Sequence, residues 1–476
     1  MHSRWWHVLG AGLLMALSRP APLPAQEKAP TAGDYLGLEP RALTLPECLE
    51  IALANQPRIH AELSSQESAQ ITAQFLNRLK ALGKLQPALG ARIDQANLGL
   101  TRAQAAVNQQ VEETFYAVRR AYYTHIYAKR VLQIAAPLEL AARRTENALL
   151  LKKRVGMALE PVVNLGKLEE TMGKSLVDVL VGLPGPNLAE EPLVRNLLRK
   201  LQWTAADERI LNRLHFQHTQ IKKKINEAEG GARQSIALLG EELGGFHRLG
   251  YQPVPAAEKL PMSGPKLDLE DLLALLDENS GELIQVRAGR AATELEVRAQ
   301  KQVAPLRGLV GTFAAATDTK TVPLPTPDRG EDFQPSVVGF ETPANLAGPR
   351  RVRLARANAL ADRARSVEES TRNLLRLQLR VTYENYVDIS LDIGSFEADA
   401  QAAKPLFTKL TSGLLNLEEA ELLVATGTLL ADLERAHFDR SVLLADLVRQ
   451  TGGALQIDID HCANPPATTG LPPASP

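Results

Sequence analysis

The sequence predicts a mainly α-helical fold built from two tandem repeats of long antiparallel helical hairpins, with a short β-hairpin region in the second repeat only. Three observations lead to this prediction. A motif that begins at Leu43 returns at Leu267, and the same offset places Asn55 on Asn279. Aromatic residues are only 4% of the chain, while apolar residues recur at helical spacings of three and four. The stretch 305–349 alone abandons that periodicity.

The first 25 residues are typical of a secretory signal peptide. Arg4 precedes the apolar run Trp5–Leu17, and the small residues of 21–25 offer a cleavage site. We therefore expect residues 1–25 to be removed on export and residues 26–42, rich in proline, glycine and alanine, to form a flexible lead-in. No later apolar run reaches the roughly 18 residues of a transmembrane helix, so strands would have to make any membrane crossing.

The first repeat is expected to cover residues 43–260. Thr44 followed by Glu47 is a capping-box pattern that starts a helix, and helical periodicity continues from there to about residue 180. Gly156 predicts the bend of the hairpin. An inserted loop and helix are expected near 182–205, and Leu239-Gly240 predicts the glycine stop of the returning helix.

The second repeat is expected to cover residues 261–455. Asp268 and Asp271 repeat the capping logic of the first motif. Two short β-favouring runs, followed by helical periodicity from Arg350, predict the β-hairpin near 305–349. Gly413 predicts the bend and Gly452-Gly453 the final helix stop. Residues 456–476 are expected to form a disordered tail.

The two halves also share an aromatic centre. Phe115 aligns with Tyr383 and Val118 with Tyr386, at an offset larger than that of the first motif. The second half therefore carries extra chain between the two landmarks, and the stretch that contains the predicted β-hairpin accounts for it.

Several functional classes are excluded by what the chain contains. The formal charge is −1, which does not favour a nucleic-acid partner. Phosphate-binding glycine loops, serine nucleophile elbows and paired zinc motifs do not occur, so we expect no enzyme, cofactor or resident metal. His215 and His218 have helical spacing but show no third ligand in the sequence. Cys48 and Cys462 could form a disulfide or remain two thiols.

Taken together, these features identify a resemblance to a known family. The doubled motif, the segment Gly348–Ala359 after the strand region, the glycines at the bends and the closing segment Leu447–Gly453 are similar to those of the TolC family of outer-membrane efflux proteins. The resemblance covers roughly residues 40–455. It implies a homotrimer in the cell outer membrane, with a periplasmic α-barrel topped by a β-barrel. Such a trimer is the exit duct of a tripartite efflux or type I secretion system, and its partners are a periplasmic adaptor and an inner-membrane pump.

The resemblance also implies a functional site at the two bends, where the adaptor would bind. Simple closure of the helical hairpins is the alternative role of the bend residues, which are Val155, Gly156, Met157, Ser412, Gly413 and Leu414. Three carboxylates just past the bends would place acidic rings at a periplasmic aperture and favour cations. A solvated helix face explains these carboxylates equally well; they are Glu160, Glu418 and Glu419.

One departure keeps a second hypothesis open. The family pattern has a strand hairpin in both repeats, but the first repeat passes from His60 to Val111 without a recognisable one. One hairpin per protomer would give a trimer six strands, below the roughly eight of the smallest membrane barrels. The alternative is a structural or scaffold protein of the periplasm that keeps the helical hairpins and has lost the pore.

Overall fold

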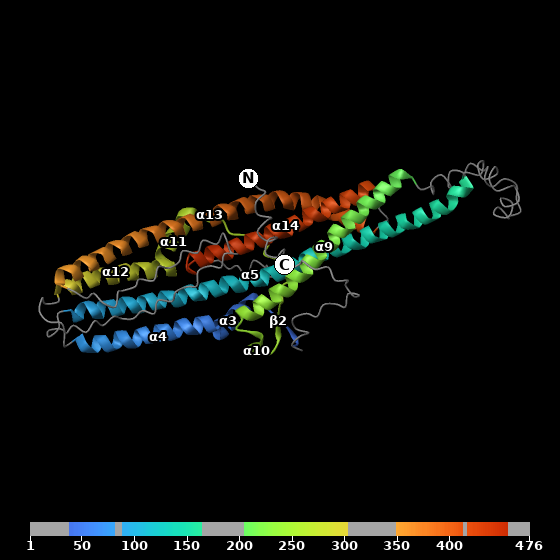
Figure 1. The fold of residues 1–476 in the computed structure, drawn as a ribbon. Coiled ribbons are helices and arrows are strands. Elements are labelled where there is room, and N and C mark those ends of the chain that lie inside the picture. The colour runs from blue at the N-terminus through green and yellow to red at the C-terminus, as the bar shows by residue number, and fades with distance from the viewer. Residues whose placement is uncertain (1–37, 81–87, 164–203, 303–348, 413–416, 456–476) are drawn as a thin grey trace, which may run out of the picture.

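The computed structural model describes residues 38–80, 88–163, 204–302, 349–412 and 417–455. Figure 1 shows an elongated molecule in which long helices lie side by side. Helices dominate the described residues, which confirms the predicted fold class. In chain order the elements are β1 (Pro40–Leu43), α3 (Leu45–Asn55), α4 (Pro57–Arg78), α5 (Leu89–Val163), α9 (Ala205–Glu242), α10 (Phe246–Leu249), β2 (Gln252–Pro255), α11 (Leu269–Asn279), α12 (Gly281–Gln302), α13 (Arg350–Ser412) and α14 (Leu417–Gln450).

The helices follow the same order in both halves: a short helix, a longer one, a very long one and a return helix. The two short helices begin where the sequence predicts. Thr44 accepts the backbone N–H of Glu47 at 3.4 Å, and the Glu47 carboxylate accepts the backbone N–H of Thr44 at 2.7 Å, which completes the capping box of α3. Asp268 accepts the N–H groups of Glu270 and Asp271 and caps α11.

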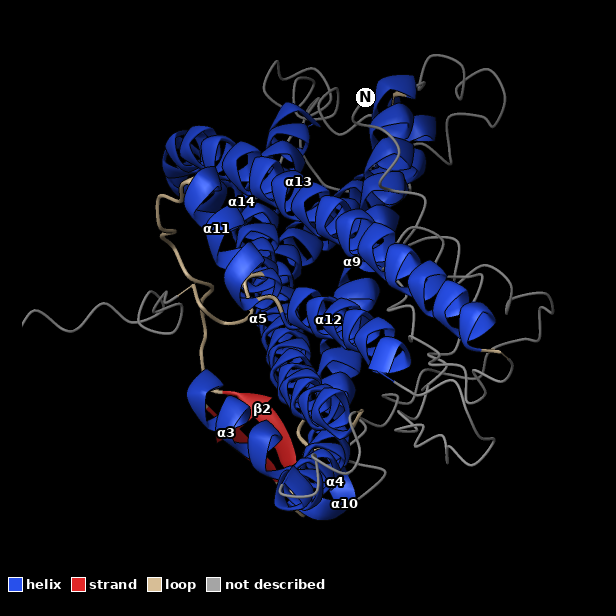
Figure 2. Ribbon diagram, turned by 90° about the vertical axis from the view of Figure 1, so that its left-hand side faces the viewer, coloured by secondary structure: helices blue, strands red, loops and turns tan. Residues whose placement is uncertain are grey.

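Helix packing produces two rows of four helices that share α5 and α13. At one end the order across the row is α4, α5, α12, α13, and at the other end it is α9, α5, α14, α13. The two very long helices run through both rows, while α4 and α9 follow one another along α5. Figure 2 shows α13 and α4 well separated across the molecule. Among the described residues, α4 packs extensively only against α5.

The helical pattern, predicted to be nearly unbroken from residue 44 to about 180, is interrupted at Gln56. α3 ends at Asn55, Gln56 is extended with φ −69° and ψ 117°, and α4 starts at Pro57. The residue before a proline is sterically kept out of the helical region, so the break follows from Pro57. Ser280 makes the equivalent break between α11 and α12, with φ −59° and ψ 119°.

The prediction of a flexible lead-in over residues 26–42 is wrong for its last residues. Residues 40–43 form β1, which pairs in parallel with β2; Pro40 lies opposite Gln252 and Leu43 opposite Pro255. Local composition could not reveal this strand, because its partner lies at the far end of the first repeat. The parallel pair therefore ties the start of the first repeat to its end.

The main core lies at the centre of the molecule, where the two repeats meet. Val118 and Tyr386, matched by the sequence alignment, are both buried in this core. The Tyr122 hydroxyl donates to the carbonyl of Leu43 at 3.2 Å and accepts the N–H of Ala257 at 3.2 Å. The Tyr386 hydroxyl donates to the carbonyl of Pro265 at 2.8 Å. These bonds fasten the segment that connects the two repeats.

The glycine stop of the second repeat is confirmed, and that of the first repeat needs correction. Helix α14 ends at Gln450, followed by Gly452 and Gly453 with φ values of 62° and 73°. Helix α9 continues through Gly240, whose missing side chain makes room for the Phe246 ring. Its stop is formed by residues 244 and 245, both glycines with positive φ.

Three other observations bear on the predicted features. Cys48 is buried and forms no disulfide within the described residues, which do not include Cys462, and burial raises the pKa of its thiol to about 12. None of the described helices is both long and apolar enough to cross a membrane. The predicted β-hairpin near 305–349, almost all of the insertion near 182–205 and the tail 456–476 lie outside the described residues.

Candidate functional site

The candidate site lies at the ends of the helices that were expected to form bends. Val155, Gly156 and Met157 are not at a bend, because α5 remains helical to Val163. This corrects the prediction of a turn at Gly156: a glycine inside a helix costs about 1 kcal/mol and does not by itself end it. Glu160 also belongs to the last turns of α5.

The second expected bend lies between two observed helix ends. α13 ends at Ser412 and α14 begins at Leu417, and the two helices pack against each other. Gly413 and Leu414 lie in that gap, outside the described residues. Glu418 and Glu419 are in the first turn of α14, where the positive end of the helix dipole favours carboxylates.

Near its tip, the first hairpin is held together by ion pairs. Lys152 of α5 donates to Asp207 of α9 at 2.7 Å, and Lys153 donates to Glu208 at 2.8 Å. Burial raises the pKa of Asp207, but hydrogen bonds from Lys152 and Thr204 outweigh it and hold the pKa below its ordinary value. The two arms of the hairpin are therefore fastened shortly before α5 ends.

Thr204 explains why α9 begins where it does. Its side chain accepts the N–H of Asp207 at 3.2 Å, and Asp207 accepts the N–H of Thr204 at 3.0 Å, forming a second capping box. The same carboxylate thus caps α9 and pairs with Lys152 of α5. The sequence pattern Thr-x-x-Asp could have predicted this helix start, but not the partner on α5.

A cluster of histidines and carboxylates makes a further connection between α5 and α9. Glu146 contacts the Nδ1 atoms of His215 at 2.8 Å and His218 at 2.7 Å. The other ring nitrogen of His218, Nε2, lies 3.1 Å from Glu139. Both His218 contacts are hydrogen bonds only when each ring nitrogen carries a proton.

The sequence prediction missed the carboxylate partners of this histidine pair. Glu139 and Glu146 are seven residues apart and therefore share a face of α5, which was a readable signal. Burial raises the pKa of Glu146, but hydrogen bonds from His215 and His218 outweigh it and leave the pKa below its ordinary value. Within the described ranges, no group of three or more histidine, cysteine or acidic side chains is arranged to hold a metal.

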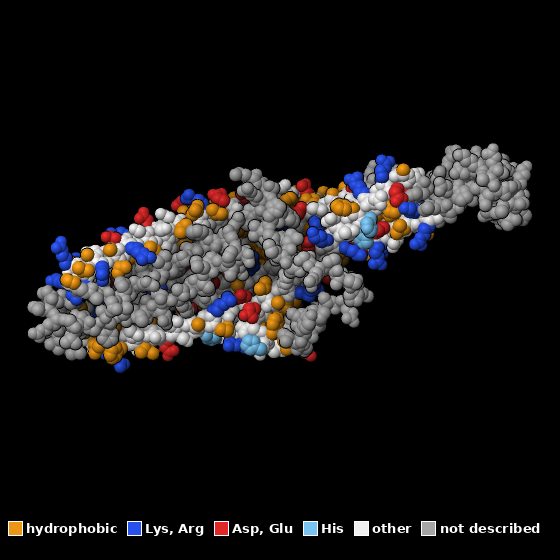
Figure 3. All heavy atoms as spheres, viewed as in Figure 1, with side chains coloured by type: hydrophobic (Ala, Val, Ile, Leu, Met, Phe, Trp, Pro, Cys, Tyr) orange, Lys and Arg blue, Asp and Glu red, His pale blue; other side chains and the backbone are white. Residues whose placement is uncertain are grey.

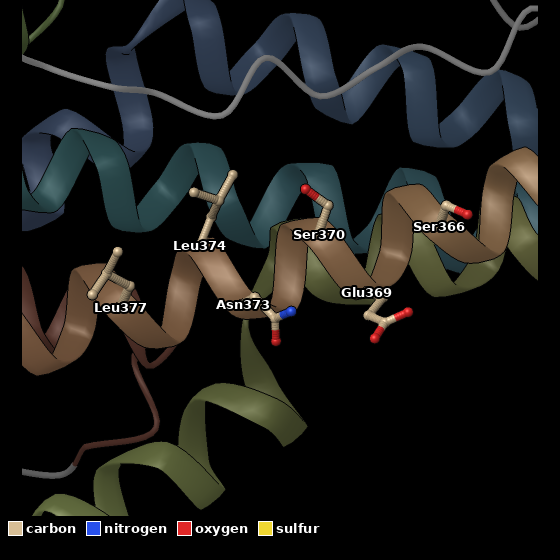
Figure 4. Close-up of a pocket in the computed structure, with 6 residues that line it drawn as sticks. All are labelled: Ser366, Glu369, Ser370, Asn373, Leu374 and Leu377. Atoms are coloured by element: carbon tan, nitrogen blue, oxygen red, sulfur yellow. The ribbon is translucent and has the colours of Figure 1, made fainter.

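A cavity among the described residues is an open depression rather than a binding pocket. It encloses about 420 Å³ and lies along one helix, α13. Figure 4 shows that its lining side chains come from successive turns of that helix and do not converge on one point. The lining residues are Ser366, Glu369, Ser370, Asn373, Leu374 and Leu377. This surface offers no constellation for catalysis.

Comparison with solved structures places this architecture among outer-membrane channels. A membrane protein from Pseudomonas aeruginosa is 13% identical to this chain, with a TM-score of 0.53. The alignment covers 91% of this chain and 96% of the Pseudomonas chain. The MtrE outer-membrane channel of Neisseria gonorrhoeae, in its open state, is 12% identical over 87% and 89% of the two chains, with a TM-score of 0.54. The outer-membrane protein VceC of Vibrio cholerae is 13% identical over 86% and 96%, with a TM-score of 0.50.

No protein-family model matches the sequence, and no curated protein matches it. At these low identities the structural similarity establishes the architecture. It agrees with the sequence resemblance, which was drawn from the doubled motif and the glycine positions. The chain has the fold of the TolC-family outer-membrane channels.

Proposed function

We propose that the protein is one subunit of a TolC-like outer-membrane exit duct, assembled as a homotrimer and joined to an inner-membrane pump by a periplasmic adaptor. In this role the protein performs no chemistry and provides a passage for solutes. The observation that carries the proposal is that the two rows of four helices each end in an uncovered helix at both edges. A row of four helices with two uncovered edges is an incomplete wall, which copies of the same chain can close.

The two edges carry exposed apolar side chains. On α13, residues 377, 381 and 391 follow helical spacing and form one stripe, which consists of Leu377, Val381 and Leu391. On the opposite edge, exposed apolar residues occur on both α4 and α9; they are Leu63, Ile71, Phe216 and Leu238. Large apolar side chains aligned at a free edge are typical of a surface that another chain covers.

These edges differ from one another, so their association is head-to-tail. An interface between unlike surfaces generates a closed ring when the rotation between neighbours closes. With three copies, α13 of each protomer meets α4 and α9 of the next, and the rows form a continuous cylinder of helices. The depression on α13, which Leu377 also lines, lies along the same edge and would receive side chains of the neighbour.

The helix ends around Val163 and Ser412 are the proposed contact with the adaptor. Val155, Gly156 and Met157 would then contribute the flank of the first hairpin, and the residues at 412–414 the turn of the second. The Lys152–Asp207 and Lys153–Glu208 pairs support movement of the first hairpin as one body. Opening would be a shift of hairpins between two packings, with Glu160, Glu418 and Glu419 lining the aperture.

The test combines assembly with conductance. The full chain, extracted from membranes in detergent, should have the mass of a trimer by light scattering and should give discrete single-channel currents in a planar bilayer. A water-soluble periplasmic protein that gives no current would overturn the exit-duct function and support the scaffold hypothesis.

A further inference from the structure

One end of the helix rows concentrates positive charge. At this end α4 and α12 finish, and α5 and α13 begin (Figure 1). The terminal turns are residues 72–80, 89–95, 296–302 and 350–356, and they contain nine lysine and arginine residues against two carboxylates. The whole chain, by contrast, has 54 basic and 55 acidic residues. The charge of this end is therefore a local feature and does not reflect the average composition.

The four helix ends are joined to one another. The Arg350 guanidinium donates to the carbonyl of Lys301 at 2.5 Å, which links α13 to α12. Arg92 pairs with Glu296 and links α5 to α12. Asn77 donates to Asn97 at 3.2 Å and links α4 to α5. We name six of the exposed or part-exposed cations of this end the basic collar; they are Arg78, Lys80, Lys301, Arg350, Arg351 and Arg353.

Helix stability does not explain this collar. The first turn of α13 contains arginines and no acidic residue, although the positive end of the helix dipole disfavours cations there. Nine cations against two carboxylates leave an excess of positive charge at this end, and one of the two carboxylates, Glu296, already pairs with Arg92. Among the described residues, no ion pair joins Arg78, Lys301 or Arg351 to a carboxylate.

Exposed apolar side chains lie among these cations. Phe75 is 57% exposed one helical turn before Arg78, and Val352 is 40% exposed between two collar arginines. Figure 3 shows basic and hydrophobic side chains side by side at this end of the molecule. Cations next to exposed aromatic and aliphatic groups fit the interface of an anionic membrane, where phosphates lie above acyl chains. A nucleic-acid site would not require the aliphatic groups.

We propose that the basic collar binds the phosphate headgroups of anionic phospholipids, so that this end of the helix rows lies against a membrane surface. The inference rests on the proposed function, because an outer-membrane duct brings one end of its helical portion to a lipid leaflet. It goes further by naming the lipid class and the residues that recognise it. In a trimer the collar would be present three times and would encircle the duct.

The experiment uses the full chain in neutral detergent, with either phosphatidylglycerol or phosphatidylcholine added to the micelles. Binding is measured by native mass spectrometry and the unfolding midpoint by circular dichroism. The test variant combines Lys301→Gln, Arg350→Gln and Arg351→Gln. The matched control combines Lys222→Gln, Lys223→Gln and Lys224→Gln, which remove the same charge from an exposed face of α9.

Phosphatidylglycerol should bind the native protein and the α9 control and raise their unfolding midpoints, and this effect should weaken as salt is added. The collar variant should bind it about tenfold more weakly or worse. Equal stabilisation by phosphatidylcholine, an equal effect of inorganic phosphate, or an unchanged collar variant would each overturn the proposal. A protein that gives no current but keeps the lipid response would overturn the exit duct and leave the collar standing.

Discussion

At the residue scale, each half repeats the same contact between an asparagine that ends the short first helix and a glycine that follows the return helix. Asn55 and Asn279 end their helices, each with its side-chain amide donating at 3.1 Å to the carbonyl four residues earlier. Gly244 lies against the backbone of Asn55, and Gly452 against that of Asn279, both with positive φ. Each return helix therefore ends on the short first helix of its own repeat.

Substituting one of these glycines should be costly. In Gly452→Ala the new Cβ would overlap the Asn279 carbonyl oxygen and hold an L-residue in the left-handed region, so we expect a loss of about 2 kcal/mol or more. The matched control is Gly230→Ala in α9, where a Cβ meets nothing within 4 Å. There the better helix propensity should gain about 1 kcal/mol. The unfolding temperature of each variant is measured by circular dichroism, and equal shifts in Gly452→Ala and Gly230→Ala would contradict this account.

Glu282 gives the molecule a pH-sensitive position in the contact of α12 with α5. Gln109 donates to its Oε1 at 3.1 Å, whereas its Oε2 is buried without a hydrogen-bond partner among the described residues. Burial raises the pKa of Glu282 to about 7, even though Arg449 acts in the opposite direction. The folded chain therefore retains a proton that the unfolded chain releases near pH 4.5.

A raised carboxyl pKa makes the folded state less stable as the pH climbs from about 4.5 to about 7. Glu282→Gln should remove this slope and stabilise the protein at pH 8 by up to about 3 kcal/mol. Denaturant unfolding at pH 5 and pH 8 measures the difference. Glu278→Gln, which alters an exposed carboxylate on the preceding helix, is the control, and it should leave the slope in place.

At the element scale, α5 holds the row together because α4, α9, α12 and α14 all pack against it. Near its start, Arg92 pairs with the buried Glu296 of α12, and Gln95 donates to the carbonyl of Ala292 at 2.9 Å and to Glu296 at 3.1 Å. Burial raises the pKa of Glu296, but the hydrogen bonds, led by that from Arg92, outweigh it and lower the pKa below its ordinary value. The carboxylate is held in its charged form.

Arg92→Gln should leave a buried carboxylate without its cation and destabilise the α5–α12 contact by about 3 kcal/mol at neutral pH. Because the pKa of Glu296 is lowered in the native fold, its stabilisation is present above the ordinary carboxyl pKa and disappears as the pH falls through the folded value. The loss in Arg92→Gln should therefore shrink in acid. The double variant Arg92→Gln with Glu296→Gln should recover part of the lost stability. If its stability loss equalled the sum of the two single losses, Arg92 and Glu296 would not be coupled.

At the scale of the whole molecule, the proposed trimer would cover the two unlike apolar edges of the helix rows. Leu391, at 71%, has the largest exposed fraction among the large apolar side chains described. It lies on α13, the edge helix that both rows share. A charge at this position would be buried unpaired if a neighbouring protomer covers it.

Leu391→Glu should therefore convert the trimer to monomers in detergent while leaving the helical content unchanged. The mass is measured by light scattering and the helicity by circular dichroism. Leu151→Glu is the matched control: Leu151 is 63% exposed, but it lies on α5, which has neighbours on both sides within the row. If both variants remain trimers, or if both become monomers, α13 is not the helix through which neighbouring protomers assemble.

Much of the helical architecture could be predicted from local patterns, because helix starts and apolar periodicity are written in consecutive residues. Thr44 with Glu47 and Asp268 with its following turn are examples that the structure confirms. The predicted bend at Gly156 was wrong. A single glycine costs a helix only about 1 kcal/mol, and ion pairs of Lys152 and Lys153 with α9 hold this part of α5 in place. The partners of His215 and His218 could not be predicted, because the packing of α5 against α9 brings them together.

By itself, the sequence determined that this protein is a duplicated helical hairpin, where the short first helix of each half begins, and that Val118 aligns with Tyr386. Those features depend on neighbours along the chain or on the repeat itself. Only the tertiary structure decided that β1 pairs with β2, that Glu146 binds two histidines, and that the basic collar is assembled from the ends of three helices, α4, α12 and α13. Each of these joins residues distant in the sequence, and their proximity is set by helix packing, which periodicity does not specify.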